Sequence, residues 1–262
     1  MQVNSESYQS HGVFADLTRY ISFYKSLTMS IFLFPTMGTK SIANIDSYTY
    51  SSMHGTLESI QTILLSGRIN DAYCLLRKYY DSAVIDIYTK LYLAEHFSIQ
   101  NFVVEEIQRW LAGKVQLPQY GIMLKYIANA QMAKPITSIL SSDNRYKPIR
   151  DRCNAHTHYK FYQHVLLNDN EVSLPNRVRW LDAFRADAQD LLVMHLGYVF
   201  FLKDHYMMSS DYTDSLECGV QPEPDSQYWV APFVQEIFDK VISPRRAKIT
   251  ATIKGSSAMH LT

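Results

Sequence analysis

Apolar residues recur every three or four positions along most of this chain, and that spacing is typical of one face of an α-helix. The pattern is clearest in residues 13–34, 68–97 and 176–208. In the second of these segments the stepping residues are Ile69, Tyr73, Leu76, Tyr80, Val84, Ile87 and Leu91. We therefore predict three long helices. We also expect Tyr73, Tyr80 and Tyr88 to pack in the core with hydrogen-bonded hydroxyl groups.

The remaining pattern predicts shorter helices and a few connecting segments. The predicted helices are 47–66, a helix ending at Leu111 and capped by Ser98 or Asn101, 122–130, 135–142, 148–167 and 228–242. Residues 209–227 are polar and are predicted to be irregular. Alternating apolar residues at 249, 251 and 253 predict a short strand or an extended arm in the tail. The pattern as a whole predicts an all-α, antiparallel helical bundle.

Composition supports this class and narrows the function. Of the 262 residues, 47% are hydrophobic and 19% charged, and glycine and proline number only nine each, which favours helix over an all-β fold. The formal net charge is zero, so the chain as a whole does not attract polyanions. Residues 145–160 are an exception, because they carry five lysines and arginines against the single acid Asp151.

Several classes of protein are disfavoured by absent signals. The three cysteines lie far apart without a C-x-x-C pair, which argues against a disulfide framework or a thiolate zinc site and favours a reducing compartment. The polar start of the chain has no signal-peptide core, and the longest apolar runs are shorter than the roughly 20 residues of a membrane span. We predict a cytoplasmic protein that does not contact a membrane. No phosphate-loop, dinucleotide or serine-nucleophile motif occurs.

The chemistry concentrates in "YKPIRDRCNAHTHYKF", residues 146–161. On a helix, Arg152, His156 and Tyr159 share a face, and Arg150 in the first turn can bend toward His156. An arginine can bind phosphate oxygens through two nitrogens, and a histidine can move a proton near neutral pH. Together they suit the cleavage of RNA without a metal ion.

The stretch "RDRCNAH", Arg150 to His156, resembles the R-x(4–6)-H motif of HEPN domains (higher eukaryotes and prokaryotes nucleotide-binding). The preceding "LLSGRINDAYCLLRKYYDSAVIDIY" resembles the helical hairpin that comes before that motif. The resemblance covers about residues 50–205. It implies a dimeric helical bundle in which two motifs form one composite site. Many such domains are metal-independent endoribonucleases of bacterial antiphage defence or toxin–antitoxin systems, and others only bind.

The resemblance also implies roles for single residues. Arg150 would stabilise charge on the phosphate, Asp151 would orient the site, and His156 would be the general acid or base. We further predict that the substrate is bound by Arg152, Asn154, His158 and Tyr159. No metal or cofactor is implied. The expected partners are RNA, a second copy of the chain and an antitoxin or defence-system protein. Residues 46–208 would form the HEPN-like bundle, with 1–45 as an N-terminal extension and 209–262 as a C-terminal one.

Other interpretations stay open. A second register pairs Arg152 with His158, although Cys153 then takes the polar position. A metal site of Asp151, His156 and His158 is disfavoured, because residues two apart on a helix diverge by about 200°. The motif is also compatible with a plain polar helix face. The chain can therefore also be a non-catalytic module that binds nucleotide, RNA or protein, or a structural protein whose tail, 247–262, swaps into a partner.

Overall fold

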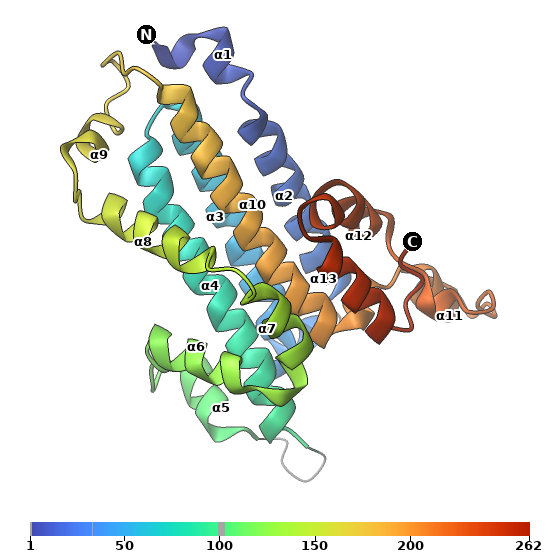
Figure 1. The fold of residues 1–262 in the computed structure, drawn as a ribbon. Helices are drawn as coiled ribbons and strands as arrows, with labels where there is room; N and C mark the ends of the chain where they lie inside the picture. The colour runs from blue at the N-terminus through green and yellow to red at the C-terminus, as the bar shows by residue number, and fades with distance from the viewer. Residues whose placement is uncertain (1, 33, 99–102) are drawn as a thin grey trace. The chain divides into compact units, whose positions relative to one another are not determined.

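The computed structural model describes residues 2–32, 34–98 and 103–262. These residues form helices and turns and no strand, so the predicted all-α class is confirmed (Figure 1). The α-helices are α1 (Glu6–Gln9), α2 (Gly12–Ser30), α3 (Ile45–Leu65), α4 (Ile69–His96), α5 (Glu105–Leu111), α6 (Tyr120–Asn129), α7 (Lys134–Leu140), α8 (Tyr146–Thr157), α9 (Tyr162–Leu166), α10 (Arg177–Leu202), α11 (Asp211–Glu217), α12 (Pro232–Ile237) and α13 (Ser243–Ser256).

Two groups of segments pack internally as separate units. The first unit contains residues 1–25, 49–83 and 143–192, and the second contains 26–48, 84–142 and 193–262. The long helices α2, α3, α4 and α10 each contribute a segment to both units. The three-part division into 1–45, 46–208 and 209–262 remains a prediction.

The first unit has a core built from the apolar stripes that the sequence pattern predicted. On α4, Tyr73, Leu76 and Tyr80 are all buried, as the spacing of three and four requires. Tyr73 donates a hydrogen bond to a carboxylate oxygen of Asp187, and the hydroxyl groups of Tyr24 and Tyr79 are 2.8 Å apart. Tyr73, Tyr24 and Tyr79 therefore each combine a buried ring with a hydrogen-bonded hydroxyl group.

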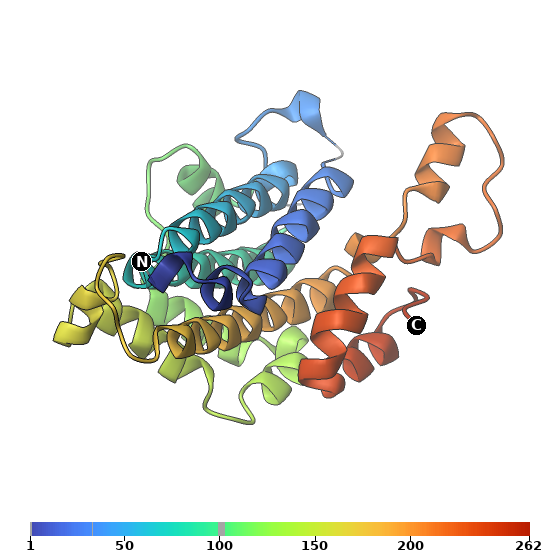
Figure 2. The ribbon, with the colours of Figure 1, turned by 90° about the horizontal axis from the view of Figure 1, so that it is seen from above.

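The second unit includes α5, α6, α7, α12 and α13. Gly197 of α10 lets α13 approach closely, because a Cβ at this position would lie 3.3 Å from Ile249. Residues 208–230, which include α11, leave this packing and return to it (Figure 2). Two backbone hydrogen bonds join the ends of this segment. Ser209 N–H donates to the Trp229 carbonyl, and Ala231 N–H donates to the Met207 carbonyl. Tyr88 is buried in this unit, also as predicted.

Several predicted elements were wrong in type or length. The helix predicted for 148–167 ends at Thr157, and the separate helix α9 follows. The helix predicted for 176–208 ends at Leu202. The segment predicted to be irregular contains α11, and the tail predicted as strand or extended arm is the helix α13. In that tail Ile249 and Ile253 are both buried, so the spacing that matters is four and not two.

Helix α5 begins at Glu105, after Val104, so Ser98 does not cap it; Asn101, the other predicted cap, lies outside the described residues. In the part of the chain that the structure describes, no helix is both long and apolar enough to cross a membrane.

Candidate functional site

Helix α8 carries the predicted motif and belongs to the first unit. Figure 1 shows it crossing α4, and ion pairs of Arg145 and Arg152 connect this region to α10. Ile149, Cys153 and His156 are buried and spaced by four and three, so they form its inward face. The proposed general acid or base therefore lies on the core side of the helix.

His156 is fully buried between aromatic rings. Its ring stacks on Tyr73 at 4.1 Å and on His164 at 4.0 Å between centroids, and its edge meets Trp180. Its Nδ1 lies 2.9 Å from the side-chain oxygen of Asn70, so Nδ1 carries the proton and donates it to that oxygen.

The second nitrogen of His156, Nε2, is buried and has no hydrogen-bond partner among the residues that the structure describes. Burial, together with the nearby His164 and Arg152, lowers the pKa of His156 from the ordinary 6.5 to about 3. The imidazole is therefore uncharged at neutral pH. In this conformation it has neither the solvent access nor the charge that a general acid requires.

Arg150 turns away from His156 and forms an ion pair with Asp81 of α4. Asp81 also accepts a hydrogen bond from Arg77, whose guanidinium contacts Asn154 as well. Asn70 and Asp81 lie about three turns, or roughly 16 Å, apart along α4. The two motif side chains are thus directed to well-separated points of the same helix.

The other arginines of this region are also paired with acids. Arg152 donates two hydrogen bonds of 2.7 Å to the two carboxylate oxygens of Asp187 on α10. Arg145 reaches Asp190 on the same helix at 2.7 Å. The local excess of positive charge in the sequence is therefore largely neutralised by acids from α4 and α10.

The remaining predicted site residues divide into two groups. Asp151, His158 and Tyr159 are exposed, while Asn154 is half-buried against Arg77. The structure therefore does not gather Arg150, Asp151 and His156 at one point within a single chain. Their predicted catalytic roles remain a prediction.

A second surface begins where α8 ends. We call residues 158–165 the basic–aromatic segment, because it exposes His158, Tyr159, Lys160, Phe161, Tyr162 and Val165. Phe161 is 64% and Tyr162 75% exposed. Between Asp151 and Asp169 the chain has no acidic residue, so nothing within the segment offsets Lys160. Exposed aromatic side chains that follow one another in this way mark a candidate interaction surface.

The backbone at the start of this segment is unusual. Helix α8 ends with Tyr159 N–H donating to the His156 carbonyl and Lys160 N–H to that of Ala155. Tyr159 stands at the position that glycine normally takes, with φ of 45°. A tyrosine in this left-handed region is strained by about 1 kcal/mol or more, and such residues cluster at functional sites.

Comparisons with family models, curated proteins and solved structures gave no match to this chain. The resemblance to HEPN domains therefore rests on the motif and the hairpin alone and stays a prediction.

Residue-by-residue reading of the motif missed Asn70, Asp81 and Asp187, because their pairing depends on how α4 and α10 pack against α8. It also left out Phe161 and Tyr162, although a signal for them was present. The run "HTHYKFY" combines basic and aromatic residues without an acid, and that composition is typical of surfaces that bind single-stranded nucleic acid.

Proposed function

We propose that this protein binds single-stranded RNA through the basic–aromatic segment and holds the RNA without cutting it. The observation that carries the proposal is the joint exposure of Tyr159, Phe161 and Tyr162 beside Lys160 and His158. Unstacked RNA bases are commonly recognised by stacking on aromatic side chains, while basic groups contact the phosphates.

The state of the arginines supports this choice of surface. Arg145, Arg150 and Arg152 each have a carboxylate partner, so a phosphate must displace an acid to reach any of them. Lys160 is exposed and lies in a stretch without acids, so a phosphate meets no competing carboxylate within the segment. The phosphate contacts are therefore assigned to Lys160, with His158 as a neighbouring hydrogen-bond donor.

The environment of His156 supports binding over cleavage. Its ring is covered by Tyr73, His164 and Trp180, and its pKa is lowered to about 3. Catalysis by His156 and Arg150 would require the imidazole to leave this stack and Arg150 to leave Asp81. The endoribonuclease activity, the homodimer and an antitoxin or defence-system partner remain predictions that the following experiment addresses in part.

The test is fluorescence anisotropy of a labelled, unstructured RNA oligonucleotide with the full chain in EDTA. We expect Phe161→Ser and Tyr162→Ser each to weaken binding about tenfold, since stacking on an aromatic side chain contributes about 1–3 kcal/mol per base. Phe34→Ser is the matched control, because Phe34 is similarly exposed at 50% but lies in the second unit. The same measurement with DNA of the same sequence tests whether the protein prefers RNA.

Three results would overturn the proposal. They are the absence of RNA binding, equal losses for Phe34→Ser and Phe161→Ser, and equal affinity for DNA. The bound RNA is also analysed on a denaturing gel. Cleavage with cyclic-phosphate ends that both Arg150→Ala and His156→Ala abolish would establish the endoribonuclease instead.

A further inference from the structure

The second unit contains a pocket that the RNA-binding proposal does not use. Its volume is about 530 Å³, which is within the usual range for small-molecule sites. The lining comes from the start of α3, the end of α4, α5 and the segment after α10. The lining residues are Met37, Ser41, Ile42, Ala43, Asp46, Lys90, Leu93, Ala94, Phe97, Gln108, Lys203 and Tyr206.

A network of charged side chains forms the polar part of this pocket and extends into the core. The ammonium group of Lys90 lies 2.9 Å from Asp46 and 2.6 Å from Asp86, which also pairs with His195 at 2.8 Å. Tyr206 donates its hydroxyl hydrogen to Asp46 at 2.7 Å. Lys90 and Asp86 are almost completely buried, so burying their charges is costly and is compensated by their pairing.

The network is suited to binding and not to proton transfer. Burial opposes the charge of Lys90, but Asp46 and Asp86 outweigh it and raise the pKa of this amine. Burial likewise opposes the charge of Asp86, and Lys90 and His195 outweigh it and lower the pKa of this carboxyl group. Both groups therefore stay charged at neutral pH, and Lys90 is not a nucleophile.

Three polar groups of the lining have no hydrogen-bond partner among the described residues. The network occupies only Oδ2 of Asp46, so Oδ1 accepts no hydrogen bond from the described residues. The side-chain amide of Gln108 and the ammonium group of Lys203 likewise have no partner among those residues. Asp46 and Lys203 both line this pocket, so one site offers both an acid and a base.

The rest of the lining is apolar and partly open to solvent. Ile42, Leu93 and Ala94 line the wall, and Met37 and Phe97 are 56% and 46% exposed. An apolar ligand group that covered these side chains would be stabilised by the area that it removes from water.

We propose that this pocket binds a small zwitterion, with its ammonium group on Asp46, its carboxylate on Lys203 and its apolar side chain against Leu93 and Phe97. A free aromatic or aliphatic amino acid has this chemistry. The site shares no residue with the basic–aromatic segment, because its lining residues all belong to the second unit.

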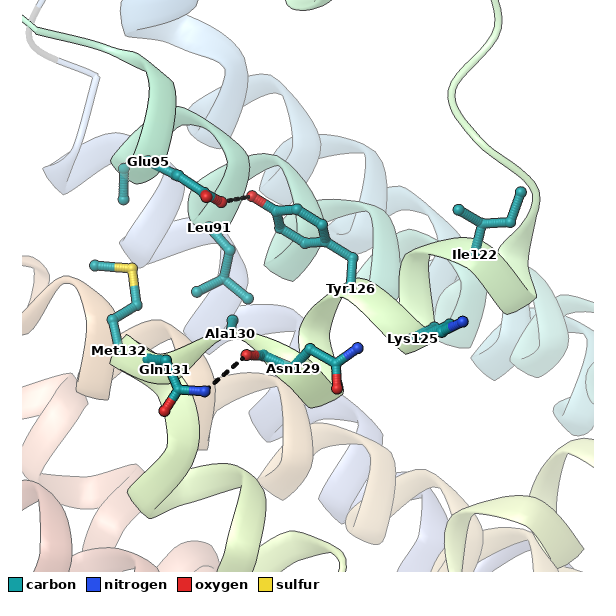
Figure 3. A pocket seen from close by; sticks show the side chains of 10 residues that line it. Leu91, Glu95, Ile122, Lys125, Tyr126, Asn129, Ala130, Gln131 and Met132 are labelled. Carbon is teal, nitrogen blue, oxygen red and sulfur yellow. Dashed lines mark hydrogen bonds between the residues drawn. The ribbon is translucent and has the colours of Figure 1, made fainter.

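A second pocket in the same unit provides a control for this proposal. It has a volume of about 590 Å³ and is lined in part by Leu91, Glu95, Tyr126 and Met132 (Figure 3). Its acid, Glu95, is already engaged by the hydroxyl of Tyr126. This pocket therefore provides apolar surface, one lysine, Lys125, and one carboxylate whose Oε2 is already engaged.

The test is isothermal titration of the full chain with L-phenylalanine, L-leucine, phenethylamine and 3-phenylpropionate. The last two compounds each lack one charge of phenylalanine. We expect at least one amino acid to bind about tenfold or more tightly than the amine and the acid of matching size, because each deleted charge removes one charge-assisted hydrogen bond. No saturable binding of either amino acid, or equal binding of phenylalanine and its two analogues, would overturn the proposal.

Two variants assign the two ends of the ligand. Lys203→Gln is expected to remove the preference for phenylalanine over phenethylamine. Asp46→Asn is expected to remove the preference for phenylalanine over 3-phenylpropionate. Lys125→Gln in the second pocket is the matched control and should change neither preference. Asp46 also pairs with Lys90, so its variant is first checked for folding by circular dichroism. If the Asp46→Asn variant does not fold, the Lys203→Gln variant and the two analogues still test the proposal. A preference for phenylalanine over phenethylamine that survives Lys203→Gln overturns the assignment.

Discussion

Tyr159 combines a strained backbone with an exposed ring, and this combination links stability to function at a single residue. Its φ of 45° lies in the left-handed region, which costs a residue with a Cβ about 1–2 kcal/mol. Its side chain is 48% exposed and therefore recovers little of this cost by packing. The strain suggests that a tyrosine is kept here for what its ring contacts.

We predict that Tyr159→Gly raises the free energy of unfolding by about 1 kcal/mol, because glycine accepts this φ without strain. The same substitution should weaken RNA binding, since the ring is lost. Urea denaturation and RNA anisotropy measure the two effects. Tyr159→Ala is the control: it removes the ring but keeps the Cβ, so it should weaken binding without any gain in stability.

His156 makes stability depend on pH. Its pKa is about 3 in the folded protein and near 6.5 when unfolded, so protonation favours the unfolded chain. The stabilising contribution of the neutral ring is complete above pH 6.5 and is lost as the pH falls below that value. Between pH 7 and pH 4.5 we expect His156 to reduce the free energy of unfolding by about 2–3 kcal/mol.

The check is urea denaturation at both pH values for the wild type and for His156→Gln, which cannot take up the proton. At pH 7 the wild type should be the more stable protein, and the difference should shrink by about 2–3 kcal/mol at pH 4.5. A difference that is independent of pH would mean that His156 is accessible and titrates normally in the folded state.

At the scale of the element, α8 is held to its neighbours by arginine–aspartate pairs. The pair of Arg152 and Asp187 has the best geometry, with two hydrogen bonds of 2.7 Å, and Asp187 is buried. We predict a coupling of about 1–2 kcal/mol in a double-mutant cycle of Arg152→Gln and Asp187→Asn, measured by urea denaturation.

The exposed pair of Lys240 and Glu236, at 2.9 Å, is the control for that cycle. Because both of its side chains are in solvent, the same cycle on this pair should give little or no coupling. Equal couplings for the two pairs would show that burial of Asp187 does not strengthen its ion pair and that α8 is held by apolar contacts alone.

Elements with a long apolar repeat could be predicted from the sequence, and elements that depend on an end signal or a short repeat could not. The repeat in α4 extends over the whole helix, so its length was predicted correctly. Helix α8 ends at Thr157 without a glycine or proline, because Tyr159 takes the left-handed position that usually needs glycine. In the tail, three alternating residues also fit a helix whose buried positions are four apart.

The candidate site could be predicted only in part, because a local sequence pattern does not show which distant residues pack against it. The motif itself is local, and its residues were found. The burial of His156 depends on Tyr73, His164 and Trp180, which approach it only after folding. No spacing within residues 146–161 contains that information, whereas the basic and aromatic composition of "HYKFY" is visible in the sequence itself.

At the scale of the whole molecule, a composite nuclease site between two copies needs His156 at a surface. In this structure aromatic rings cover the imidazole, and its Nδ1 donates a hydrogen bond to Asn70 of α4. A second copy docking against α8 would therefore meet the exposed Asp151, not the imidazole. Dimerisation alone does not complete the site, and a rearrangement around His156 would be required as well.

The formal net charge of zero determines how RNA binding should depend on salt concentration. A formal net charge of zero gives no long-range attraction to RNA, so the salt dependence of binding should report only local contacts. Each phosphate contact on a single strand contributes a slope of about −0.7 to a plot of log K against log salt concentration. With Lys160 as the main contact, we predict a total slope between about −0.7 and −2, measured by anisotropy from low to physiological salt.

Lys160→Gln should make that slope shallower by about 0.7, while Lys40→Gln, an exposed lysine of the second unit, should leave it unchanged. Phe161→Ser should lower the affinity at every salt concentration and keep the slope, because stacking releases no counterions. A much steeper slope in the wild type would mean that the paired arginines of α8 exchange their aspartates for phosphates, and the binding surface would then extend from the basic–aromatic segment onto α8 itself.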